Sequence, residues 1–159
     1  MHTCIVWTRA DGGVTVQCPA DRYVASFPTE AEGIAAVIAK DIPLDRQHTA
    51  VVCTHDDLPS TRRFRNCWRR PTARVVVDLP LAREQRLEEL RRDRTPRLAK
   101  SDIDVVRALE DPSSARVGLL RTYRQALRDL PATSHLGLAA CPTADALAAW
   151  EPAWPVDPA

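Results

Sequence analysis

Long apolar runs are absent from this chain of 159 residues. A helix needs about 20 consecutive apolar residues to cross a bilayer, and no stretch of the sequence reaches that length. The first residues, MHTCIVWTRADGG, also lack the charged start and the longer apolar core of a secretory signal peptide. We therefore expect a protein with no membrane segment that is not exported and folds where it is made.

Catalytic signatures are absent as well. The sequence contains no G-x-S-x-G, Walker, H-E-x-x-H or dinucleotide-binding pattern, and it has only five glycines. The pair Gly12 and Gly13 suits a tight turn better than a phosphate-binding loop. We therefore predict a protein that is not an enzyme, with no catalytic residues and no cofactor.

No C-x-x-C pair occurs among the five cysteines, which are Cys4, Cys18, Cys53, Cys67 and Cys141. An odd count at wide spacing argues against a disulfide framework and against a structural zinc site. Buried free thiols are the expected state. A bridge between Cys4 and Cys18, which could face each other across a hairpin, is the alternative.

The segment CTHDD, residues 53–57, gathers soft and hard metal ligands at the end of an expected strand. A metal site needs three or four converging ligands, and no second cluster occurs elsewhere in the sequence. A strand that ends in a turn is the simpler interpretation, so we predict no metal site.

The first half of the chain has the pattern of a small α+β domain, predicted over residues 1–80. Residues 4–18 alternate around Asp11-Gly12-Gly13 and predict a hairpin. Residues 28–43 predict a helix, because Thr29 and Glu32 have capping-box spacing. Two further strands are predicted over 48–55 and 72–80.

After Pro80 the apolar period changes from two to about 3.6, which predicts a helical hairpin over residues 81–131. Pro96 should break or kink its first helix, and residues 111–114 (DPSS) should turn the chain. The second helix, 115–131, places Leu120, Tyr123, Leu127 and Leu130 on one face and should end at Pro131. Residues 132–159 predict a short helix, capped by Thr143, and an extended tail rich in proline and tryptophan.

Positive charge is concentrated in one part of the chain although the net charge is only +1. Residues 61–100 carry 13 Arg or Lys and five acids, a local net charge of +8. At its start, Arg62, Arg63 and Arg65 surround Phe64 and precede Trp68. Three interpretations stay open: a surface that binds single-stranded nucleic acid, a docking surface, or aromatic rings that fill the core beneath solvated arginines. We predict that the two aromatic residues anchor the junction between the two halves, and that the arginines contact another protein.

Two other features point to partners. Arg124 and Arg128 form an unfavourable pair of like charges at i and i+4, which calls for a carboxylate in this chain or in another. Trp150 and Trp154 lie on the proline-rich tail. They either anchor a neighbouring subunit or fold back onto the helical hairpin.

Two blocks of the sequence resemble proteins of tailed bacteriophages and prophages. DLPSTRRFRNCWR, followed by VVVDLPLAREQRLEELRR, is similar to a small family with a DLP…R-x-FRNAW box and a charged helix. Cys67 stands where that box usually has alanine. TYRQALRDLP (122–131) is similar to a helix of tail-fibre, tail-fibre-assembly and tail-assembly-chaperone proteins, which often end in WP-x-x-P, as AWPVDP (153–158) does here.

The resemblance implies a structural virion protein of the tail or tail fibre, made in the bacterial host cytoplasm. It would self-associate, with a dimer as the first expectation, and dock other phage tail or fibre proteins. The alternatives are an assembly chaperone absent from the mature particle and an accessory protein that binds nucleic acid. The residues predicted to bind partners are Arg62, Arg63, Phe64, Arg65, Trp68, Tyr123, Arg124, Arg128, Trp150 and Trp154.

Overall fold

The computed structural model describes residues 3–72, 74–110 and 115–158. The fold is α+β, as predicted, with two compact units, Met1–Asp78 and Leu79–Ala159. The boundary lies two residues before the predicted one. The predicted third segment, 132–159, is part of the second unit rather than a separate region.

The first unit contains a three-stranded antiparallel sheet. Its strands are β1 (Thr3–Thr8), β2 (Val14–Gln17) and β3 (Val51–Thr54), in the order β2-β1-β3. The turn between β1 and β2 uses Gly12 at φ 77°, a conformation that glycine adopts without strain. The predicted hairpin over 4–18 is therefore confirmed.

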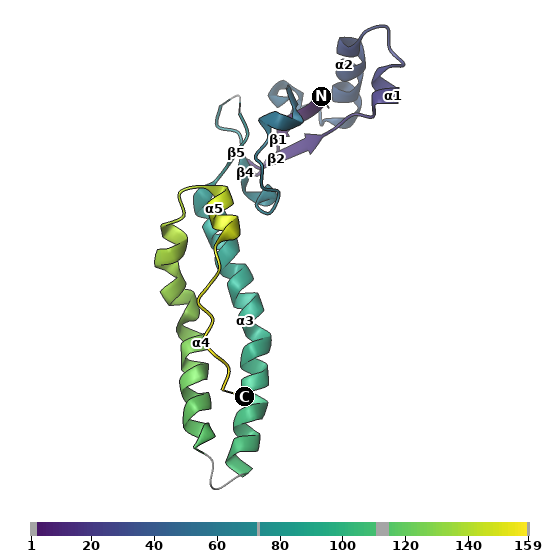
Figure 1. The fold of residues 1–159 in the computed structure, drawn as a ribbon. Helices are drawn as coiled ribbons and strands as arrows, with labels where there is room; N and C mark the ends of the chain where they lie inside the picture. The colour runs from purple at the N-terminus through teal and green to yellow at the C-terminus, as the bar shows by residue number, and fades with distance from the viewer. Residues whose placement is uncertain (1–2, 73, 111–114, 159) are drawn as a thin grey trace. The chain divides into compact units, whose positions relative to one another are not determined.

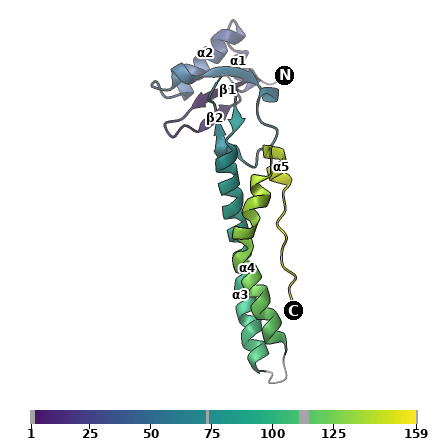
Figure 2. The same cartoon turned by 90° about the vertical axis from the view of Figure 1, so that its left-hand side faces the viewer.

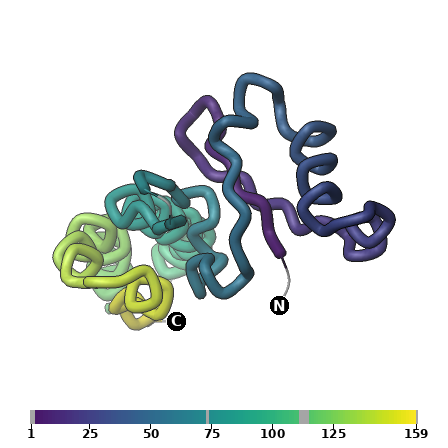
Figure 3. The backbone as a smooth tube through the Cα atoms, turned by 90° about the horizontal axis from the view of Figure 1, so that it is seen from above, coloured from purple at the N-terminus to yellow at the C-terminus, as the bar shows by residue number. Residues whose placement is uncertain are grey.

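One face of this sheet packs against helix α2 (Glu30–Asp41), which lies beside the strands in Figure 3. Ile5 of β1 forms a buried cluster there with Val37 and Ile42. The predicted cap is present, because the Thr29 side chain accepts a hydrogen bond from the Glu32 N–H at 3.2 Å. A short helix that the sequence did not predict, α1 (Asp21–Val24), precedes α2.

The other face of the sheet packs against the segment that follows β3. Its buried cluster joins Cys4, Val6 and Val14 to Leu58, Trp68 and Val75. The predicted strand over 72–80 is reduced to β5 (Val76–Val77), which pairs with β4 (Trp68–Arg69). It cannot continue to residue 80, because the next helix begins at Leu79. Three single-turn helices complete the unit: η1 (Gln47–Thr49), η2 (His55–Asp57) and η3 (Arg65–Cys67).

The second unit is a helical hairpin with a returning tail. Helices α3 (Leu79–Glu110) and α4 (Arg116–Ala139) run side by side, and the residues after α5 (Ala144–Ala149) run back along them (Figures 1 and 2). The predicted face of α4 is buried, and Thr143 caps α5 as predicted. The turn predicted over 111–114 lies outside the described residues.

Neither internal proline ends its helix. α3 continues through Pro96 and α4 through Pro131 to Ala139, so the predicted end of α4 was wrong. Pro131 has no N–H to donate to the Leu127 carbonyl one turn earlier. The Arg94 side chain of α3 supplies the missing donor, with Nη1 at 3.4 Å from that oxygen and at 3.1 Å from the Arg128 oxygen.

Candidate docking surfaces

The two aromatic residues of the arginine-rich segment are inside the protein. Phe64 and Trp68 have 0% of their surface exposed, so in this conformation neither ring can meet a partner or stack on a base. Predicting them as partner-binding residues was therefore wrong. The pattern of arginines around aromatic residues suggested a binding surface, whereas the two rings are part of the core beneath the sheet. Their predicted role at the junction of the two halves stays a prediction.

The arginines around these rings bind the first unit itself. Arg62 lies over the Trp68 ring at 5.1 Å, with Nη2 2.5 Å from Nε2 of His55. Others donate to backbone carbonyl oxygens: Arg65 to Val16 at 3.5 Å, Arg69 to Trp68 at 2.9 Å and Arg70 to Thr49 at 2.5 Å. The contacts of Arg65 and Arg70 tie this segment to distant parts of the unit. Arg62, Arg63 and Arg65 are nevertheless exposed, so their contact with another protein stays a prediction.

The CTHDD segment forms a capped turn. The Asp57 carboxylate accepts hydrogen bonds from the Thr54 N–H at 2.8 Å and the Thr54 hydroxyl at 2.7 Å. These two bonds hold the pKa of Asp57 below its ordinary value. Within the part of the chain that the structure describes, no group of three or more His, Cys, Asp or Glu residues could hold a metal ion.

The proline-rich tail lies against its own helical hairpin. Arg86 of α3 lies over the Trp150 ring at 5.7 Å and donates to the Trp150 carbonyl at 3.0 Å. Arg97 lies over the Trp154 ring at 4.2 Å. Lys100 binds Asp157 at 2.8 Å, and its pKa is raised by Asp157 first and by Asp104 second. Of the two predicted fates of the tail, the structure shows the intramolecular one, so both tryptophans are partly covered.

Gly137 of α4 makes room for the first tryptophan of the tail. A Cβ atom at this position would lie 2.8 Å from Nε1 of Trp150, closer than real side-chain contacts allow. The other glycine of α4, Gly118, has open space around it. The position of Gly137 therefore matters for packing of the tail.

Sequence reasoning missed the function of one arginine face. Arg83, Arg86, Arg94 and Arg97 belong to a single face of α3, at helical three- and four-residue steps through Leu90. Arg83 donates to the last carbonyl oxygens of α4 and beyond, those of Leu138, Ala139 and Cys141. Such donors satisfy the carbonyl groups that a helix end leaves unpaired. The spacing was visible in the sequence, but a charged residue in this pattern is usually read as solvated.

The predicted partner residues of α4 divide into two kinds. Tyr123 is buried in the hairpin, so its prediction as a partner-binding residue was wrong. Arg124 has the carboxylate that the charge pattern called for, because it forms a salt bridge with Asp102 of α3. Arg128 is exposed.

An apolar stripe that the sequence analysis did not single out lies on α3. Ile103, Val106 and Leu109 are 55%, 58% and 61% exposed, although each is a large hydrophobic residue. They recur every three residues, whereas the buried residues of the same stretch are Ser101, Asp104 and Ala108. The stripe is therefore on the side of α3 that faces away from its packing within the chain.

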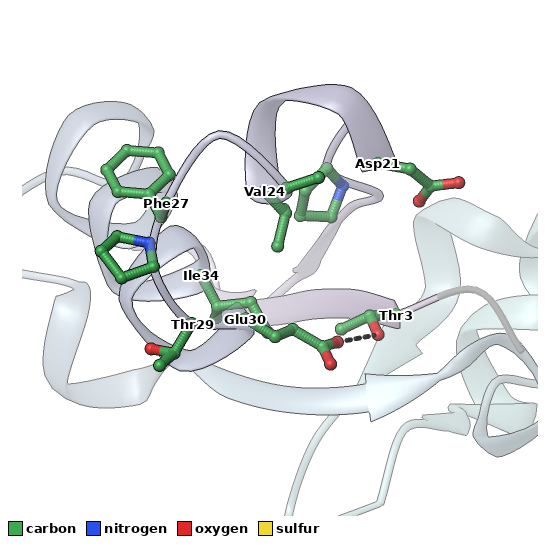
Figure 4. A pocket seen from close by; sticks show the side chains of 10 residues that line it. Thr3, Asp21, Val24, Phe27, Thr29, Glu30 and Ile34 are labelled. Carbon is green, nitrogen blue, oxygen red and sulfur yellow. Dashed lines mark hydrogen bonds between the residues drawn. The ribbon is translucent and has the colours of Figure 1, made fainter.

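The first unit also has a small cavity of about 300 Å³, beside α1 and the start of α2 (Figure 4). Val24, Phe27 and Ile34 give it apolar walls. Thr3 donates a hydrogen bond to the Glu30 carboxylate at 3.1 Å across one side. Its volume is at the lower limit for sites that bind small molecules.

In the part of the chain that the structure describes, no helix has both the length and the apolar character needed to span a membrane. Comparison of the chain with protein-family models, with curated proteins and with solved structures finds no match.

Proposed function

We propose that this chain is a structural, non-enzymatic protein of a bacteriophage tail or tail fibre, which self-associates and docks other tail proteins. The resemblance of residues 57–69 and 122–131 to phage tail proteins supports the biological setting. The observation that carries the docking role is the apolar stripe of Ile103, Val106 and Leu109, each of which is more than half exposed in the described chain.

The stripe is a better docking surface than the residues that the sequence suggested. Phe64, Trp68 and Tyr123 are committed to the core, and both tail tryptophans lie against α3 arginines. Large apolar side chains left exposed on a long helix are typical of helices that pack against a partner. A second copy of this chain, packing stripe against stripe, would bury them.

Light scattering during size-exclusion chromatography, over a range of protein concentrations, tests this proposal. The wild-type chain should form dimers, and Val106→Asp should shift it to monomers, because a charge would be buried in the interface. Leu136→Asp is the matched control, since Leu136 is 83% exposed on α4 and outside the stripe. A wild-type chain that is monomeric at every concentration, or equal effects of the two substitutions, would contradict self-association through the stripe.

The two alternative functions give different results. An assembly chaperone would be abundant in lysates and absent from finished particles. A nucleic-acid-binding protein would bind with steep salt dependence, because phosphate contacts release counterions. The burial of Phe64 and Trp68 disfavours it, since single-strand binding relies on exposed aromatic rings.

A further inference from the structure

Three cysteines form a row across the sheet of the first unit. Cys4 lies on the central strand β1 and pairs directly with Cys53 of β3. On the other side, Ile5 pairs with Gln17 of β2, so Cys18 comes next in register, opposite Cys4. Directly opposed residues of neighbouring strands point to the same face of a sheet. The three thiols therefore share one face.

The backbone hydrogen bonds show which neighbour is closer to Cys4. The Thr8 N–H bonds toward the β3 side, to Thr49, and the Arg9 N–H bonds toward the β2 side, to Gly13. Because these directions alternate along a strand, Cys4 directs its backbone groups to β3. Cys4 and Cys18 are then a non-hydrogen-bonded pair, the kind with Cα atoms only about 4.5 Å apart.

The side chains agree with the backbone. The Sγ atoms of Cys4 and Cys18 lie 2.8 Å apart. A Cα separation of about 4.5 Å falls within the range of about 4.4–6.8 Å that a disulfide spans. The two sulfurs therefore need no rearrangement of β1 and β2, which are neighbours in Figure 1, in order to bond.

We propose that Cys4 and Cys18 form a reversible disulfide and are a thiol-modification site of the first unit. The exposure of the two thiols determines which of them an oxidant reaches first. Cys18 is exposed, whereas Cys4 is completely buried, so an oxidant meets Cys18 first. Cys67 and Cys141 are buried, and Cys53 is intermediate between the two classes.

With oxidised glutathione as the oxidant, the chemistry is two thiol–disulfide exchanges. The Cys18 thiolate attacks one glutathione sulfur, expels a glutathione thiolate and forms a mixed disulfide. The Cys4 thiolate then attacks Sγ of Cys18 and expels the second glutathione. The two cysteines lose two protons and two electrons, and the oxidised glutathione becomes two molecules of reduced glutathione.

The environment of Cys4 keeps it from attacking a dissolved oxidant, so it acts only in the second exchange. Burial first, and then the hydrogen bond with Cys18, raise the pKa of Cys4 to about 12. A thiol with so high a pKa is mostly protonated and unreactive toward molecules in solution. In the second exchange Cys4 attacks through its small thiolate fraction, and its proton goes to solvent. The contact between the two sulfur atoms makes this attack intramolecular.

Peptide mapping of the full-length chain tests the proposal. The protein is equilibrated in glutathione buffers from fully reduced to fully oxidised, alkylated, and digested with trypsin without reduction. Cleavage after arginine places each cysteine on its own peptide, with Cys4 on residues 1–9 and Cys18 on 10–22. We expect these two peptides to become linked as the buffer becomes oxidising, and to separate again when the buffer is reducing.

Two variants make the assignment specific. Cys53→Ser is the matched control and should keep the linked peptides, whereas Cys18→Ser should lose them. Linkage of Cys4 to Cys53 in the wild-type chain would overturn the proposal. So would alkylation of both cysteines at every ratio, or a product that stops at glutathione on Cys18. If Cys18→Ser does not fold, the wild-type and Cys53→Ser maps decide between these outcomes.

Discussion

Replacing Trp68 by alanine should remove a large part of the stability of the first unit. The side chain has no exposed surface and packs with five other buried residues from the sheet and the following segment. Truncation of a buried aromatic side chain to alanine costs about 3–5 kcal/mol. At about 0.05–0.15 kcal/mol per residue, a unit of this length has a free energy of unfolding of about 4–12 kcal/mol. The loss is therefore about a quarter or more of the total.

Urea titration under reducing conditions measures this loss. We expect Trp68→Ala to lower the urea concentration at which half of the first unit is unfolded. The far-ultraviolet circular dichroism of α3 and α4 should keep its midpoint, because the core cluster around Trp68 belongs to the first unit. Trp154→Ala, which removes a half-buried ring beside Arg97, is the control and should lower stability much less. A loss below about 1 kcal/mol for Trp68→Ala would refute the assignment of Trp68 to the core, since buried aromatic truncations cost several times more.

Two further predictions concern the helical hairpin. Arg94→Met should destabilise it by about 1–3 kcal/mol, because the Leu127 carbonyl would be left without a donor beside Pro131. Adding Pro131→Ala to Arg94→Met restores an N–H at position 131 and should recover part of the lost stability. If urea titrations show that the effects of the two substitutions simply add, the two residues are not coupled and the explanation is wrong. Gly118→Ala should stabilise α4 by about 0.5–1 kcal/mol through reduced backbone entropy, because nothing surrounds Gly118. Gly137→Ala should not give this stabilisation, because its methyl group would displace Trp150. Equal melting temperatures for the two variants would show that the tail does not pack against Gly137.

Local patterns predicted most of the fold. The alternation of residues 4–18 predicted the hairpin, and the structure has the same alternation, with Ile5 buried on one face of the sheet and Cys4 and Val6 on the other. The caps at Thr29 and Thr143 were also visible, because a hydroxyl that accepts an N–H bond within one turn needs no distant partner.

Features that depend on distant contacts could not be predicted in this way. Pro131 predicts a helix end because the sequence itself shows that proline has no backbone N–H to donate. The replacement donor, Arg94, comes from another helix and is not evident from the sequence near Pro131. The strand over 72–80 was overestimated for a related reason. Its valines favour a strand, but among the described residues only Val76 and Val77 pair there, and the strand cannot reach residue 80 because α3 begins at Leu79.

The candidate site was predicted less well than the fold. Phe64 and Trp68 were chosen because aromatic residues among arginines are common in interfaces. The same residue types serve the core equally well, and only burial separates the two roles. The charge argument for Arg124 was more informative, because it called for a carboxylate that Asp102 provides.

The proposed function places this chain in phage particles, and quantitative mass spectrometry of particles purified from its source tests that central claim most directly. Because the proposed role is structural, the chain should be present in mature particles at a fixed, integral copy number. Absence from the particles, with abundant protein in the lysate, would contradict that role and identify an assembly factor instead.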